Sequence, residues 1–155
     1  MNAEVVDWKT SKPNQFQARA LVEGTFLEVT TDRSSHFHFS VQIGPDAKRD
    51  VVEIVYNKKF GNFPTPYKGM KVSACGDFIN AFKASGGYPA SPAGAIIHWV
   101  HVNPGERNST HPDGYVVMDG ELVGHNYSRN DSGDERSNGS VASTAHKIVR
   151  DSEAR

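Results

Sequence analysis

Apolar and polar residues alternate along much of the chain, a pattern typical of β-strands that are buried on one face only. In residues 35–43 the alternation is strict, and Phe37, Phe39 and Val41 fall on one face. His36 and His38 fall on the other face. Further runs rich in apolar and β-branched residues predict strands at residues 17–30, 51–56, 68–78, 95–102, 115–118 and 121–123. The last two runs flank an Asp-Gly pair, so they are predicted to form a hairpin.

Five or six short strands without a convincing helix predict an all-β fold, either a small barrel or a sandwich. The order of the strands favours an OB-like barrel. Its first strand is long and bends at Gly24, two more strands follow, and a turn at Lys68-Gly69 opens the fourth. Residues 57–66 contain two prolines and a glycine. They are therefore predicted as a loop, where many OB folds have a helix.

The two ends of the chain differ from this core. Residues 1–16 mix polar groups with Pro13 and are predicted as an N-terminal arm, followed by the barrel domain at residues 17–124. Residues 125–155 are predicted as a disordered polar tail, because they have too few apolar side chains to offset the entropy of ordering. The start of the chain lacks the basic and apolar regions of a signal peptide, which predicts a cytoplasmic protein. A mature form that had lost a leader would be exported.

The composition narrows the classes of partner. The 155 residues are 37% hydrophobic and 23% charged, as in a soluble globular protein. No apolar run is long enough to cross a bilayer, so a membrane is not predicted as a partner. The formal net charge of −1 disfavours a tight, sequence-independent grip on nucleic acid at neutral pH. Histidines add positive charge below about pH 6.5. Cys75 is the only cysteine, so an intramolecular disulfide and a cysteine-based zinc site are excluded.

The densest group of chemical side chains lies between residues 97 and 115. It includes His98, His101 and His111, and imidazole both titrates near neutral pH and is the commonest metal ligand. On a regular strand His98 and His101 point to opposite faces. They can share a site only if the strand breaks near residues 100–102, which would let one of them meet His111. Asp113 would then orient an imidazole, and Arg107 would bind an anion.

Two chemistries stay open for this group. The three histidines are candidate ligands of a divalent transition metal that activates water. Alternatively, two of them act as general base and general acid, and Arg107 or the lysines of the 57–66 loop stabilise a developing anion. His36 and His38 are a lesser candidate pair, because their spacing permits joint contact with a metal. In the shared site, Gly114 would permit an unusual backbone angle in the loop that carries His111 and Asp113. In a third interpretation all these histidines are structural residues, and Asp113 and Gly114 only form the turn into the final hairpin.

A second candidate surface combines aromatic residues with lysines in the 57–66 loop. Single-strand binding proteins use such residues for base stacking and phosphate contacts. The candidate ligand-binding residues are Lys58, Lys59, Phe60, Phe63, Trp99 and Tyr115. The other interpretation of this loop is that Phe60 and Phe63 close the mouth of the barrel.

The closing segment carries a specific pattern. A glycine-led strand contains I-H-W-x-H, and a Pro/Gly/Arg loop, H-x-D-G and an aromatic residue follow. The residues that carry it are Gly94, Ile97, His98, Trp99, His101, Pro104, Gly105, Arg107, His111, Asp113, Gly114 and Tyr115. Across residues 18–122 the chain resembles a small, functionally uncharacterised bacterial family of OB-like domains. The resemblance implies a fold and marks a site, but it implies no established activity. Family members commonly carry an export leader and a shorter 103–110 loop.

Two functions follow from these observations. The first is a hydrolase-like protein with a His/Asp site that acts on phosphodiester or nucleic-acid-related substrates, since OB barrels often bind nucleic acids or sugars. The alternative is a non-catalytic binding module for single-stranded nucleic acid or oligosaccharide.

Overall fold

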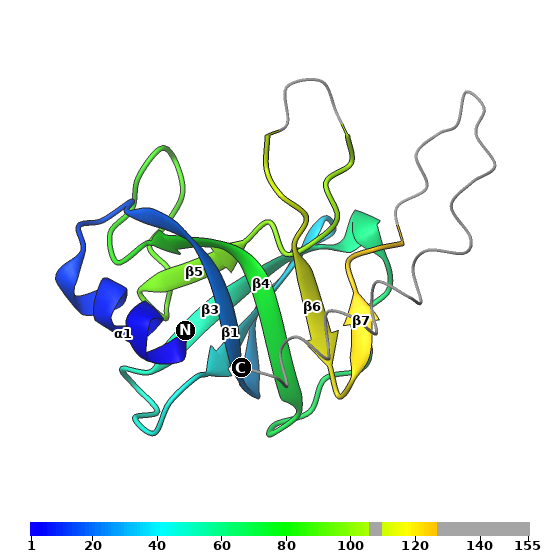
Figure 1. Ribbon diagram of the computed structural model, residues 1–155, viewed down its shortest axis with the longest axis horizontal. Coiled ribbons are helices and arrows are strands. Elements are labelled where there is room, and N and C mark those ends of the chain that lie inside the picture. The colour runs from blue at the N-terminus through cyan, green and yellow to red at the C-terminus, as the bar shows by residue number, and fades with distance from the viewer. Residues whose placement is uncertain (106–109, 127–155) are drawn as a thin grey trace.

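The computed structural model describes residues 1–105 and 110–126, and there it contains one α-helix and seven strands (Figure 1). The elements are α1 (Asn2–Ser11), β1 (Gln17–Asp32), β2 (His36–Gln42), β3 (Val51–Asn57), the 3-10 helix η1 (Lys58–Phe60), β4 (Lys71–Asn80), β5 (Ala95–His98), β6 (Tyr115–Met118) and β7 (Glu121–Val123). The predicted all-β class is confirmed. Residues 127–155, where most of the predicted disordered tail falls, lie outside the described residues.

Five strands pair in a closed ring in the order β1-β2-β3-β5-β4, and β4 pairs back to β1. The pairing of β3 with β5 is parallel, and the other pairings are antiparallel. β1 closes the ring by changing partner along its length. Its first half pairs with β4 and its second half with β2, and Thr25 pairs with both. At the preceding position, a Cβ on Gly24 would lie 2.0 Å from the carbonyl oxygen of Gln42. Only glycine therefore permits this close approach at the bend.

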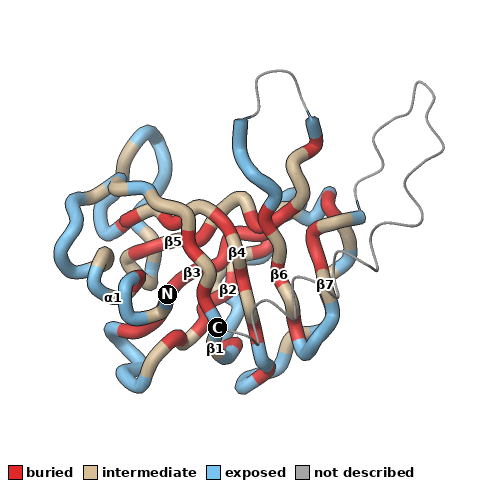
Figure 2. The backbone as a smooth tube through the Cα atoms, viewed as in Figure 1, coloured by how far each residue is buried: buried red, intermediate tan, exposed pale blue. Residues whose placement is uncertain are grey.

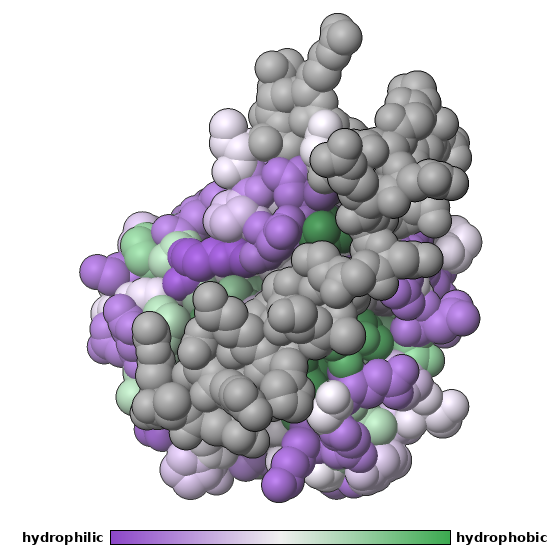
Figure 3. Space-filling model, turned by 45° about the vertical axis from the view of Figure 1, so that its right-hand side comes forward, coloured by the Kyte–Doolittle hydropathy of each residue, from purple (hydrophilic) through white to green (hydrophobic). Residues whose placement is uncertain are grey.

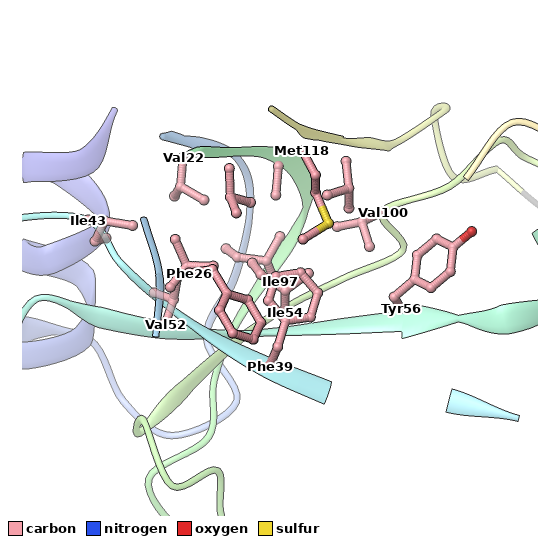
Figure 4. Close-up of a cluster of buried hydrophobic side chains, with 14 of the residues drawn as sticks. Val22, Phe26, Phe39, Ile43, Val52, Ile54, Tyr56, Ile97, Val100 and Met118 are labelled. Carbon is pink, nitrogen blue, oxygen red and sulfur yellow. The ribbon is translucent and has the colours of Figure 1, made fainter. Parts of the chain in front are cut away.

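The core lies inside the ring and follows the alternation of the sequence. Phe39, Ile54 and Ile97, from β2, β3 and β5, are fully buried and point toward one another (Figure 4). Along β4 buried residues alternate with more exposed ones (Figure 2). Hydrophilic residues predominate on the face that Figure 3 shows. The polar residues that could carry chemistry therefore lie on the outer face of the strands.

The predicted N-terminal arm is wrong for its first part, because residues 2–11 form α1. The helix lies on the side of the ring opposite the β6–β7 hairpin (Figure 1). Val5 is fully buried, and the Trp8 ring lies 5.4 Å from the Phe78 ring. The fully buried Asn80 donates hydrogen bonds from Nδ2 to the carbonyl oxygens of Trp8 and Lys12. A helix of ten residues is marginal alone, so these contacts stabilise it.

Candidate functional site

β5 ends at His98 because the next residue, Trp99, has a backbone φ of +59°. A bulky residue rarely adopts this left-handed conformation. A residue in this conformation does not continue a strand. The predicted strand is therefore wrong for residues 99–102. Residues held in such strained conformations cluster at functional sites. The break directs attention to the side chains around Trp99.

Gly114 holds this break in place. Its N–H donates to the carbonyl oxygen of His101 at 2.7 Å, and a Cβ on Gly114 would lie 2.0 Å from the carbonyl oxygen of Trp99. The φ of Gly114 is not in the left-handed region, unlike those of Gly105 and Gly120. The predicted need for an unusual backbone angle at Gly114 is therefore wrong, and the position needs glycine for space.

The three predicted metal ligands all lie near the indole of Trp99. Ring centroids lie 6.1 Å from Trp99 for His98, 4.9 Å for His101 and 4.3 Å for His111. Within residues 1–105 and 110–126 no three His, Cys, Asp or Glu side chains lie where they could hold a metal ion. The metal site predicted from His98, His101 and His111 is therefore not formed.

His101 has a packing role instead of the predicted catalytic one. Its side chain is buried and stacks face to face on Phe60, with ring centroids 3.7 Å apart and planes 10° apart. Its Nδ1 is 2.8 Å from the carbonyl oxygen of Val102. Burial is the largest cause of its lowered pKa. His101 therefore packs in the interior next to the site and is too buried to contact a substrate.

The imidazole of His111 lies within hydrogen-bond distance of Asp77, a residue of β4 that the sequence analysis did not single out. His111 Nδ1 lies 2.7 Å from one carboxylate oxygen of Asp77, and Arg19 Nη1 lies 2.9 Å from the other. The side chain of His111 is 48% exposed, so Nε2 is the ring nitrogen that can meet a substrate. Asp77 is the register partner of His98 on the neighbouring strand. A correct strand register, which the sequence did not provide, would have found it.

Asp113 does not orient an imidazole, contrary to the prediction. One of its carboxylate oxygens accepts a hydrogen bond from the backbone N–H of Asn103 at 2.6 Å, and its carbonyl oxygen accepts one from Arg19. The side-chain amide of Asn103 donates to the carbonyl oxygen of His111 at 2.7 Å. Asp113 therefore fixes the loop that carries His111. The predicted anion-binding residue Arg107 lies outside the described residues.

His98 lies on the outer face of β5 beside this pair. Burial, followed by the nearby His101 and His36, lowers the pKa of His98 to about 4. Its imidazole is therefore neutral at neutral pH, with one N–H donor and one acceptor nitrogen. His98 and His111 therefore differ in environment, since His98 is largely buried and faces Asp77 across the strand pair, whereas His111 is half-exposed and contacts the Asp77 carboxylate.

The low pKa of His98 predicts a loss of stability in acid. Between pH 6.5 and about 4 the unfolded chain binds a proton at His98 that the folded chain does not, so stability falls as the pH falls. We expect a loss of about 2–3 kcal/mol across this window, to which His101 adds in the same direction. Urea unfolding at several pH values measures it. His98→Gln should flatten the slope; an unchanged slope in His98→Gln would contradict the prediction.

The aromatic residues of the 57–66 loop pack inward. Phe60 is buried, and the Phe63 ring lies 4.8 Å from the Tyr56 ring and 5.1 Å from the Phe37 ring. The interpretation that Phe60 and Phe63 close the mouth of the ring therefore fits the structure, whereas base stacking on them does not. Lys58 pairs with Asp32, and Lys59 lies 5.2 Å over the Phe60 ring. Tyr115 is partly buried in β6, and burial raises its pKa to about 12.

Comparison of the chain with known protein families, with curated proteins and with solved structures finds no match. In the described part of the chain no helix is long and apolar enough to cross a membrane. Function is therefore inferred from the site itself, which consists of Asp77, His111, His98, Trp99 and Arg19.

Proposed function

We propose that the protein is a hydrolase that cleaves phosphodiester bonds by metal-free acid–base catalysis. The observation that carries the proposal is the 2.7 Å contact between His111 and Asp77 at a half-exposed position. A carboxylate bound to Nδ1 fixes the tautomer of an imidazole and stabilises the imidazolium that forms when Nε2 takes up a proton. The neutral His98 on β5, the strand that pairs with β4, supplies a second polar group.

The reaction uses these groups in sequence. His111 Nε2 removes a proton from the attacking water as its oxygen bonds to phosphorus. The bond from phosphorus to the leaving oxygen breaks on the opposite side of phosphorus, that oxygen takes up a proton from solvent water, and the imidazolium of His111 releases its proton to solvent. His98 donates its N–H to a non-bridging phosphoryl oxygen, where charge accumulates. Arg19 is a positioning residue, because it holds Asp77 and the carbonyl oxygen of Asp113.

The fold supports this substrate class by analogy. We interpret the ring, with its bent β1 and its parallel pairing of β3 with β5, as an OB-like barrel extended by the β6–β7 hairpin. The resemblance of the closing segment to a family of OB-like domains agrees with this interpretation. OB folds commonly bind oligonucleotides and oligosaccharides. A non-catalytic binding module is less well supported, because Phe60 of its predicted surface is buried against His101 and Phe63 packs against the core.

Hydrolysis of bis(p-nitrophenyl) phosphate tests the proposal. The full chain is expected to release p-nitrophenolate in excess EDTA at least tenfold faster than the His111→Ala variant, since general acid–base groups typically contribute about 10²–10⁴-fold. Added zinc or manganese should not raise the rate. Equal rates for the two proteins would contradict the proposal, and activity that EDTA abolishes would contradict its metal-free mechanism.

A further inference from the structure

We infer that the substrate is a single-stranded polynucleotide and that His36, His38 and Lys59 bind a phosphate next to the one that is cleaved. The inference rests on the proposed function for the position of the cleaved phosphate. The inference adds a binding subsite on a different strand, β2. A polymeric substrate would occupy this subsite, whereas a small phosphodiester would not reach it.

The subsite adjoins the proposed catalytic site. The His36 ring lies 6.5 Å from the His98 ring and 6.4 Å from the His38 ring. His36 and His38 are both partly exposed on the outer face of β2. The three imidazoles therefore form a row of neighbouring rings that includes His98. This row extends the polar surface beyond the proposed catalytic site, where the next phosphate of a strand would lie.

Hydrogen bonds fix the two outer imidazoles. His38 Nδ1 lies 3.1 Å from a carboxylate oxygen of the buried Glu53, so its Nε2 is directed away from that carboxylate. Glu53 also accepts hydrogen bonds from Thr30 at 2.8 Å and from Ser91 at 2.5 Å. His36 Nδ1 lies 2.9 Å from the hydroxyl of Ser35.

The acidic groups near this row already have partners. Glu53 has the contacts described above, Asp77 is held by Arg19 and His111, and Asp32 pairs with Lys58. Arg19 and Lys58 therefore balance the charges of Asp77 and Asp32, whereas the buried Glu53 is held by hydrogen bonds from two hydroxyls and by its contact with His38. Lys59 stands on η1, next to the end of β3.

Burial is the largest cause of the lowered pKa of His36, and the neighbouring His38 and Lys59 lower it further. For His98, burial, His101 and His36 lower the pKa by more than Asp77 raises it. An anion bound here would oppose the effect of the neighbouring positive charges. It would raise the pKa of His36, so binding would take up protons.

The sign of the pH dependence follows from this linkage. Because the anion prefers the protonated imidazoles, affinity should increase as the pH falls. The formal net charge of −1 agrees, since it gives the chain little general affinity for polyanions at neutral pH. The subsite therefore predicts binding that is weak at pH 7.5 and substantially tighter at pH 5.5.

Fluorescence anisotropy with labelled single-stranded oligothymidylate tests the inference. All proteins carry His111→Ala, so that the strand is not cleaved. We expect affinity to rise at least about tenfold from pH 7.5 to 5.5. Adding His36→Gln should flatten that rise. Adding Lys59→Gln should weaken binding at both pH values and reduce the salt slope by about 0.7, the contribution of one phosphate contact on a single strand.

Lys48→Gln is the matched control, because it removes the same charge from an exposed turn at the other end of the β2–β3 hairpin. It should leave affinity unchanged. A pH-independent affinity, an unaltered pH dependence in the His36→Gln protein or equal weakening by Lys48→Gln would overturn the inference. Equal affinity for heparin would overturn the choice of nucleic acid. Failure of the proposed function would appear separately, as a wild-type chain without phosphodiesterase activity.

Discussion

Replacing Asp77 by asparagine is expected to lower kcat on bis(p-nitrophenyl) phosphate by about 10²–10⁴-fold. The exchange preserves the shape of the side chain but removes the charge that faces His111 Nδ1. The amide –NH₂ can then donate to Nδ1, which leaves the proton on Nε2 and so prevents Nε2 from acting as a base. Loss of the ion pair with Arg19 adds a smaller effect on the position of the loop.

Asp113→Asn provides the matched comparison for this experiment. Asp113 is the carboxylate that the sequence pattern assigns as the orienting group, whereas the structure gives it a backbone contact with Asn103. An asparagine oxygen at position 113 can still accept that hydrogen bond, so kcat should change less than about threefold. Circular dichroism and urea unfolding establish that both variants fold. A larger loss in Asp113→Asn than in Asp77→Asn would restore the assignment from the sequence and contradict the one from the structure.

The pattern of apolar and polar residues predicted where each of the seven strands lies, although it extended β5 beyond His98. In β2 the pattern places Phe37 and Phe39 inward and His36 and His38 outward, and the burial of each residue agrees. Such predictions succeed because the period of two in a strand is a local property of the backbone. The same pattern could not predict α1, whose residues are ordered by contacts with distant strands, such as that between Trp8 and Phe78.

The site was predictable only in part, because its geometry depends on register. His111 was found from the sequence, as one of several histidines close together. Its partner Asp77 lies 34 positions earlier and comes close because β4 pairs with β6, the strand that follows His111. The left-handed conformation of Trp99 has no local signal either, since tertiary contacts impose it on a residue that disfavours it. The sequence therefore located the segment but misassigned the roles of His101 and Asp113.

Gly114→Ala is expected to destabilise the protein by about 4 kcal/mol or more, or to prevent folding, because a backbone segment would have to move. The new Cβ would lie 2.0 Å from the carbonyl oxygen of Trp99 and 2.7 Å from that of Cys75. Neither atom belongs to a flexible side chain that can rotate away. The strands that meet here would have to separate, and Trp99 would lose the position that places it against His111.

Gly120→Ala separates this effect from the general cost of replacing a glycine. Gly120 has a φ of +84°, but a Cβ there would meet nothing within 4 Å, so its replacement should cost only about 1–2 kcal/mol of backbone strain. Urea unfolding of the two variants beside wild type gives both values. If Gly114→Ala cost no more than Gly120→Ala, the close approach at Trp99 would not be a constraint on the fold. A folded Gly114→Ala protein with full phosphodiesterase activity would further show that catalysis does not depend on the placement of Trp99 against His111.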